Sequence, residues 1–459
     1  MGCKQLQLNN FFRFSEPEGI NRSNFRFVES EDGSPALQPK KNINHSPLII
    51  NNYFPVITDP KGRQTTFTYD ALGRQLTRTL PMGQTEHKVY NSLGQLETET
   101  DFKGIVTEFI YDNFGRLTEK TYTDPSTGVT DSVTFTYDAL GRQSTVTDSR
   151  GTTTYSYNSQ NSLIKISTPE GEIHYEYDAV TGRKTRTYSA NTDTAYTYDE
   201  LGRLKTVTDK DGNTTTYDYT AVGSRSAVSL PNGVTTQYTY DDLNRLTELV
   251  NKDSNKTLSS YTYTLAPNGL RTGVLEKTLN DDTSTYTERT ITYTYDDLKR
   301  LVREESTAST SSTLTYTDEY VYDLVGNRLK KTHTSVSSVQ SVAYSYNDND
   351  QLIEETSSTD GTTTYTYDAN GSLISKSNTT TGENYAYTYN LQNRLASATI
   401  TRTEKDELGT PKLVEITANY AYNINGIRVV SNTTTTIDGG TSETKNRTYL
   451  LDKLYGTGS

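Results

Sequence analysis

The side chains that could carry chemistry in this 459-residue chain are few and scattered. The single cysteine, Cys3, excludes an internal disulfide framework. The four histidines lack the spacing of metal ligands; they are His45, His87, His174 and His333. In "EIHYEYD", strand alternation places His174 on the face opposite Tyr175. We interpret these histidines as structural, and we predict no catalytic, cofactor-binding or metal-binding residues and hence no enzyme.

An aspartate and an arginine recur four residues apart in many copies of one turn. An arginine follows a turn glycine that itself follows an aspartate by three residues; examples are Arg74, Arg116, Arg142 and Arg203. Each arginine lies next to its turn aspartate, and stacking of repeats would bring it over an aromatic ring, which contributes about 0.5–2 kcal/mol. A structural role is the favoured interpretation, and a sugar- or phosphate-binding role is the alternative.

The composition indicates which elements must position these side chains. Hydrophobic residues are only 32% of the chain and tryptophan is absent, yet there are 36 tyrosines and long runs of threonine. Threonine and tyrosine favour strands. The net charge of −12 argues against nucleic-acid binding. No apolar stretch is long enough for a transmembrane helix, and the N-terminus lacks the apolar run of a signal peptide.

A tyrosine recurs mostly every 20 to 24 residues, giving sixteen copies of one repeat. In all but one copy, the residue two positions earlier is also aromatic, so the two rings share one face of a strand. The predicted structural tyrosines are Tyr69, Tyr90, Tyr111, Tyr137, Tyr157, Tyr177, Tyr198, Tyr219, Tyr240, Tyr263, Tyr295, Tyr322, Tyr346, Tyr367, Tyr389 and Tyr422.

Each tyrosine is followed by a turn. Asp or Asn comes next in most copies, and the fourth residue after the tyrosine can adopt positive φ, which is typical of a type I turn with a bulge. The predicted turn glycines are Gly73, Gly94, Gly115, Gly141, Gly202, Gly223, Gly326, Gly371 and Gly426. Asn161, Asn244, Asp350 and Asn393 replace glycine in four copies, whereas Lys299 predicts a different or strained turn.

A second turn with the same offset lies halfway along each repeat, as in Asp59–Gly62, Asp101–Gly104, Asp148–Gly151 and Asp209–Gly212. Two strands and two tight turns per repeat predict an all-β fold: a long antiparallel meander of hairpins. Strand twist, and the need to shelter the aromatic face, predict that this ribbon spirals into a partial hollow shell. Unpaired edges also predict self-association.

The motif Y-D-x-x-G-R-L followed by T-x-x-x-D-x-x-G resembles the YD (RHS) repeat of Rhs proteins, Tc toxin components and teneurins. "TYDALGRQLTRT", "TYDELGRLKTVTDKDG" and "IYDNFGRLTEKT" carry the resemblance, which covers roughly Val56 to Tyr422. It implies a spiral β-sheet forming a hollow shell that encloses a toxic C-terminal domain in some members and is linked to carbohydrate binding in others. Because no self-cleaving motif or toxin domain is visible, we expect a fragment or a truncated member.

We therefore predict three regions: an unassigned, partly flexible segment at 1–55, with a linker in "SEDGSPALQPKKN", an array of about sixteen repeats at 56–430, and the start of a post-repeat region at 431–459. The predicted function is a non-catalytic shell segment of a secreted or cell-surface toxin-type protein. Its expected partners are the rest of the shell or an enclosed effector. The alternative is an adhesion or carbohydrate-binding module, with cell-surface glycans as partners.

Overall fold

The computed structural model describes two short strands, 25–29 and 35–39, and residues 54–450 except 255, 281–284, 309–311, 406–407 and 441. His45, Cys3 and the residues after 450 lie outside the described part. The chain divides into two units, 1–89 and 90–459. In the first unit, β1 (Phe25–Glu29) pairs with β2 (Pro35–Pro39). The second strand, β2, lies within "SEDGSPALQPKKN", and the partly flexible segment at 1–55 stays a prediction.

The described residues from 54 to the end of the first unit form a hairpin meander, whose last strand ends at Tyr90. Its strands are β3 (Val56–Thr58), β4 (Gln64–Tyr69), β5 (Gln75–Thr79) and β6 (Thr85–Tyr90). Pairing is antiparallel from β3 to β4, from β4 to β5 and from β5 to β6.

The second unit continues the same pattern over thirty strands. They are β7 (Leu96–Thr100), β8 (Val106–Tyr111), β9 (Leu117–Thr123), β10 (Thr130–Tyr137), β11 (Gln143–Asp148), β12 (Gly151–Tyr157), β13 (Leu163–Thr168), β14 (Gly171–Tyr177), β15 (Lys184–Tyr188), β16 (Asp193–Tyr198), β17 (Leu204–Asp209), β18 (Thr214–Tyr219), β19 (Arg225–Ser229), β20 (Thr235–Tyr240), β21 (Leu246–Lys252), β22 (Thr257–Leu265), β23 (Arg271–Leu279) and β24 (Tyr286–Tyr295). The remainder are β25 (Leu301–Ala308), β26 (Tyr316–Tyr322), β27 (Arg328–Ser335), β28 (Val339–Tyr346), β29 (Leu352–Ser357), β30 (Gly361–Tyr367), β31 (Leu373–Asn378), β32 (Asn384–Tyr389), β33 (Leu395–Lys405), β34 (Pro411–Tyr422), β35 (Arg428–Ile437) and β36 (Ser442–Thr448), with a short 3-10 turn, Ser312–Leu314, before β26.

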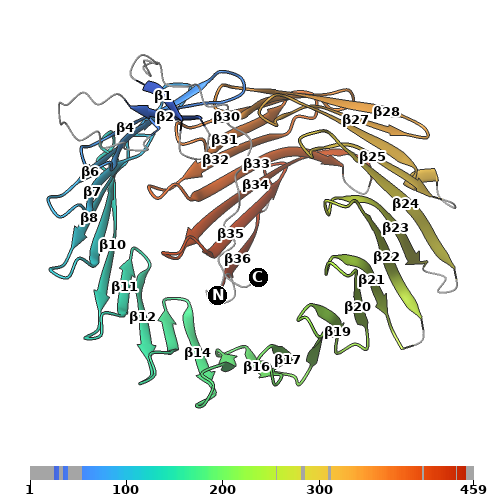
Figure 1. The fold of residues 1–459 in the computed structure, drawn as a ribbon, viewed down its shortest axis with the longest axis horizontal. Helices are drawn as coiled ribbons and strands as arrows, with labels where there is room; N and C mark the ends of the chain where they lie inside the picture. The colour runs from blue at the N-terminus through green and yellow to red at the C-terminus, as the bar shows by residue number, and fades with distance from the viewer. Residues whose placement is uncertain are drawn as a thin grey trace. The chain divides into compact units, whose positions relative to one another are not determined.

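From β7 to β36, each strand pairs antiparallel with the next in the sequence, and the ribbon of the second unit curves round an open interior (Figure 1). Strands β30 to β33 come back alongside β7 to β10, because side chains of the two segments bond directly. The predicted fold, an all-β hairpin meander that spirals into a partial hollow shell, is confirmed. Strand twist explains the curvature, since a long ribbon with neighbouring strands rotated by roughly 20–25° cannot stay flat.

The core of the second unit is thin, as expected for a single curved sheet. The buried apolar side chains are mostly isolated along the ribbon, and Ile166, Ile173 and Tyr175 form a small cluster on β13 and β14. Stability therefore comes from contacts between adjacent repeats, as in other repeat proteins, and less from one central core.

Candidate functional site: the repeat turns and the seam

Most turns after the repeat tyrosines form a hydrogen-bonded cage around their first residue, which is usually an aspartate. In the turn Asp199–Gly202, the backbone N–H of Asp199 donates to the Arg203 carbonyl at 2.9 Å, and that of Gly202 donates to the Asp199 carbonyl at 2.8 Å. The Asp199 carboxylate accepts the backbone N–H of Arg203 at 2.9 Å and its Nε at 2.7 Å. Gly202 has φ of 79°, where a Cβ would be strained. The nine predicted turn glycines all have positive φ.

The hydrogen bonds of this cage lower the pKa of turn aspartates such as Asp241. The side chain of Arg245 and then its backbone N–H hold the pKa of Asp241 below its ordinary value of 3.8. Asparagine makes the same backbone bonds without charge: Asn91 Oδ1 accepts the N–H groups of Leu93 and Gln95, each at 3.0 Å.

The repeat tyrosine joins each hairpin to the one before it. Tyr219, at the end of β18, donates its hydroxyl to the Leu204 carbonyl at 2.8 Å, while the Arg203 guanidinium lies 4.5 Å from its ring centre. The same bond, from a repeat tyrosine to the residue just after the previous arginine position, recurs at 2.7–3.0 Å along the second unit; the donors are Tyr111, Tyr137, Tyr157, Tyr177, Tyr198, Tyr219, Tyr240, Tyr295, Tyr322, Tyr346, Tyr367 and Tyr389. We call this bond, together with the arginine over the ring, the repeat staple.

The expected stacking of repeat arginines on rings is present. Arg116 lies 4.6 Å from the Tyr137 ring and Arg142 lies 4.4 Å from the Tyr157 ring. The hydroxyl bond of the staple explains why the repeat position holds tyrosine, since phenylalanine would bury the same ring but could not donate this bond.

The other predicted tyrosines do not all occupy this position. The hydroxyl of Tyr69 lies 3.4 Å from the Phe54 carbonyl in the first unit, and Tyr90 and Tyr422 end β6 and β34. Tyr263 was assigned to the wrong position: β22 continues to Leu265, which pairs with Arg271 across the bulge. The turn that follows is Ala266–Gly269, and the "APNG" there is the sequence signal that the tyrosine spacing concealed.

One further turn differs from the prediction, and the turn at Lys299 has the strain that was predicted for it. Asp148 pairs directly with Gly151, so β11 and β12 are joined by a two-residue loop without the predicted bulge. Lys299, in contrast, keeps the usual bonds with Asp296 and Arg300 despite φ of 66°. Its turn is strained but not different, because the cage imposes the geometry at a cost of about 1–2 kcal/mol.

Two of the three histidines on the described strands, His174 and His333, have ordinary partners. His174 stacks on Tyr188 with ring centres 4.9 Å apart. His333 Nδ1 lies 2.6 Å from a carboxylate oxygen of the buried Asp318. Burial alone would raise the pKa of Asp318, but hydrogen bonds with His333 and Lys331 outweigh it, so the pKa is lowered. Within the part of the chain that the structure describes, no three His, Cys, Asp or Glu side chains are grouped to hold a metal ion.

The turns form two edges of the ribbon. We call the edge with the tyrosine-terminated turns the YD rim and the other edge the opposite rim. In the second unit, the YD rim of β30 to β35 meets the opposite rim of β7 to β14, and we call this contact the seam. Asn370 donates to Asp101 at 2.7 Å, Lys103 pairs with Asp368 at 3.2 Å, and Gln392 donates to Asp131 at 3.1 Å.

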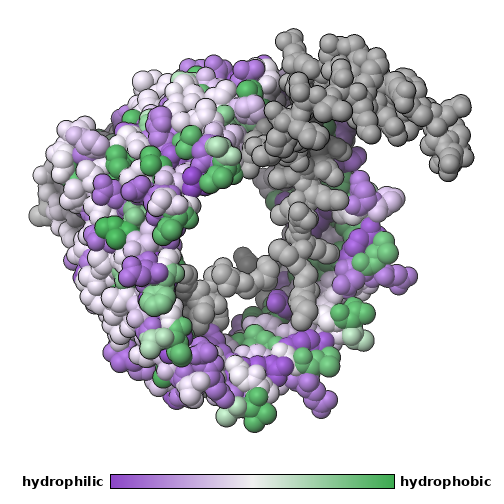
Figure 2. Space-filling model, turned by 60° about the vertical axis from the view of Figure 1, so that its left-hand side comes forward, coloured by the Kyte–Doolittle hydropathy of each residue, from purple (hydrophilic) through white to green (hydrophobic). Residues whose placement is uncertain are grey.

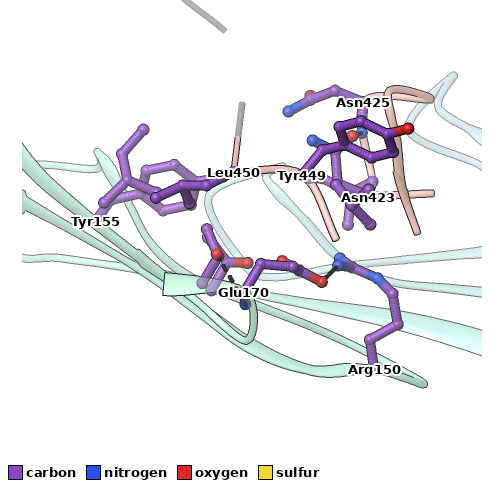
Figure 3. A pocket seen from close by; sticks show the side chains of 12 residues that line it. Arg150, Tyr155, Glu170, Asn423, Asn425, Tyr449 and Leu450 are labelled. Carbon is purple, nitrogen blue, oxygen red and sulfur yellow. Dashed lines mark hydrogen bonds and ion pairs between the residues drawn. The ribbon is translucent and has the colours of Figure 1, made fainter. Parts of the chain in front are cut away.

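A small pocket continues the seam between the turn Asn423–Gly426 and strands β12 and β13 (Figure 3). Arg150 forms ion pairs with Asp148 at 2.7 Å and with Glu170. Burial lowers the pKa of this guanidinium, but the two carboxylates more than compensate and raise it. The backbone after β36 closes the pocket, since Leu450 packs against the cluster of Ile166, Ile173 and Tyr175.

The pattern of staple, hairpin meander and seam defines a class of protein: a repeat β-shell. Sequence comparison agrees. The RHS Repeat family model matches residues 56–85, 90–127, 137–173 and 346–380, and the Teneurin YD-shell model matches residues 173–265. Together these segments span about half of the sequence. The chain belongs to the RHS-repeat (YD-repeat) β-shell family.

Solved structures with a similar arrangement include Tc toxin components. The crystal structure of TcdB2-TccC3-Cdc42 is 15% identical, with a TM-score of 0.35 over 84% of this chain and 28% of that chain. A Photorhabdus luminescens Tc holotoxin pore is 13% identical, with a TM-score of 0.32 over 82% and 27%. This chain thus spans between about a quarter and a third of their length, and at these scores the classification rests on the repeat models. No curated protein matches the sequence.

Proposed function

We propose that this chain is a non-catalytic wall segment of a hollow shell that encloses a polypeptide effector attached beyond the array. The observation that carries the proposal is the seam. Three successive contacts join laps of the ribbon that are far apart in the sequence, so the ribbon is held as a continuous curved wall. Two of these contacts are amide–carboxylate hydrogen bonds and the third is an ion pair, and all three serve to hold the laps together.

The end of the array also supports an enclosed effector. Leu450, the last described residue, packs on the aromatic face of β13 and β14 beside the seam. We keep the array boundaries of 56–430, and we infer a secreted or cell-surface protein from the family. No helix that could span a bilayer occurs among the described residues.

A carbohydrate-binding role has less support from the side chains. Sugar recognition would use open aromatic faces, but repeat rings such as those of Tyr157 and Tyr219 are covered by arginines and their hydroxyls are bonded to the backbone.

Protease protection tests the enclosure. A flexible peptide carrying a protease site is added after Ser459, and the same peptide is added before Met1 as the matched control. We expect cleavage of the C-terminal site to be several-fold slower. Lys103→Asp places a carboxylate beside Asp368 and opens the seam, so it should remove the protection. Equal cleavage at both ends of the unsubstituted chain would contradict the proposal.

A further inference from the structure

The third residue of the YD turns forms an exposed apolar row along the second unit. These side chains lie between 47% and 93% exposed; they are Leu93, Phe114, Leu140, Val180, Leu201, Val222, Leu243 and Leu298. We call them the tip row. Figure 2 shows apolar residues protruding one after another along the edge of the ribbon. Gln160 and Asn268 occupy the same turn position and interrupt the row.

The same turn position is polar where the YD rim is covered by the seam. Asn370 and Gln392 stand there and donate to aspartates of the neighbouring lap, and Asn425 lines the pocket. An amide therefore fits this turn. In water, turns favour such polar residues, and an exposed leucine gains nothing. Apolar tips recurring along the uncovered rim therefore need a separate cause, and contiguous exposed apolar surface generally marks an interaction site.

We propose that the tip row is the contact surface for a second copy of this chain, with the two YD rims packed face to face. The spacing of the tips supports this partner. Successive tips are separated by two strands, roughly 10 Å at about 4.8 Å per strand, and another YD rim has the same period. A two-fold axis perpendicular to the axis of the spiral turns one helical rim into another of the same handedness. The tips of the two copies can therefore stay in register along the whole tip row. Such an isologous contact is the commonest in homo-oligomers.

The opposite rim of another copy is a poorer partner. Its turns carry carboxylates such as those of Asp101, Asp148 and Asp209. In the seam, amides of the YD rim donate to Asp101 and Asp131 on this side, whereas apolar tips would desolvate the carboxylates without bonding to them. Rim-to-rim packing avoids that cost.

The area is also sufficient. A leucine or valine side chain contributes roughly 60–120 Å² of apolar surface, from about 1.5–3 kcal/mol at 25 cal/mol/Å². Eight such tips give on the order of 500–1,000 Å² per partner, which brackets the ~800 Å² of a standard interface. Acidic neighbours in the turns, Glu200, Asp242 and Asp297, repel each other across the contact, so added salt should strengthen it.

Sedimentation of the full chain at several concentrations, at low and at moderate salt, tests the proposal. We expect a monomer–dimer equilibrium, favoured by salt. The double variant Leu201→Asn and Leu243→Asn should raise the Kd at least tenfold without unfolding the chain, because asparagine occupies this position in the seam. Val336→Asn, an equally exposed change on a turn of the opposite rim, is the matched control and should leave the Kd unchanged.

Two results would overturn the proposal. One is a monomer at all concentrations up to about 100 µM. The other is a dimer whose Kd does not respond to the tip variants but is abolished by Thr444→Pro in β36, which would show that the copies pair through a strand edge.

Discussion

The repeat staple predicts that a single hydroxyl couples two neighbouring hairpins. Tyr219→Phe keeps the ring under Arg203, 4.5 Å from the guanidinium, and removes only the 2.8 Å bond to the Leu204 carbonyl. A hydrogen bond of this kind contributes about 0.5–1.5 kcal/mol net. Since 1.4 kcal/mol is a factor of ten, local opening should become roughly two- to twelve-fold more frequent.

Hydrogen exchange is the assay that fits a repeat protein, because unfolding of a long array need not be a single transition. We expect faster exchange in β17 and β18 and unchanged exchange in strands several repeats away. Tyr217→Phe, on the same strand but outside the staple, is the matched control.

A second substitution separates the two parts of the staple. Arg203→Gln removes the contact with the ring, and its coupling with Tyr219→Leu should be about 0.5–1 kcal/mol, as for a partly exposed cation–π pair. If Tyr219→Phe changes exchange no more than Tyr217→Phe does, or if the change spreads uniformly along the array, the staple is not what couples the hairpins.

Two further predictions concern the turns. Because the pKa of Asp241 is below 3.8 in the folded chain, its bond with Arg245 stabilises the fold above that pH, and the contribution is lost as the pH falls through the lowered value. Asp241→Asn should therefore flatten the dependence of the denaturation midpoint on pH between about 5 and 2, and an unaltered slope would contradict this. Gly202→Ala should destabilise its hairpin by about 1–2 kcal/mol, because φ is positive and alanine tolerates this conformation poorly. Gly223→Asn, with nothing within 4 Å of its Cβ position, should be nearly neutral in the same thermal melt, and equal effects of the two changes would refute the argument.

The local structure of this chain follows from its sequence because the interactions that fix it span few residues. The aspartate, the glycine and the arginine of a YD turn bond within five positions of one another, as in Asp199–Arg203, and strand alternation puts each aromatic pair on one face. Where the tyrosine was followed by a different turn, as at Tyr263, the spacing misled and the turn residues were the better guide. The sequence shows that Lys299 stands where the turn needs a residue with positive φ. It does not show that the turn forms nonetheless, because the hydrogen bonds with Asp296 and Arg300 outweigh the backbone strain.

The seam and the tip row were decided by the tertiary structure alone. Asn370 and Asp101 are 269 residues apart, and they meet only because small rotations between many strands accumulate into a closed lap. No local pattern encodes that sum. The sequence shows that some turn tips carry leucine and others asparagine. Only the tertiary structure shows that asparagine tips such as Asn370 lie against the next lap and the leucine tips lie in water.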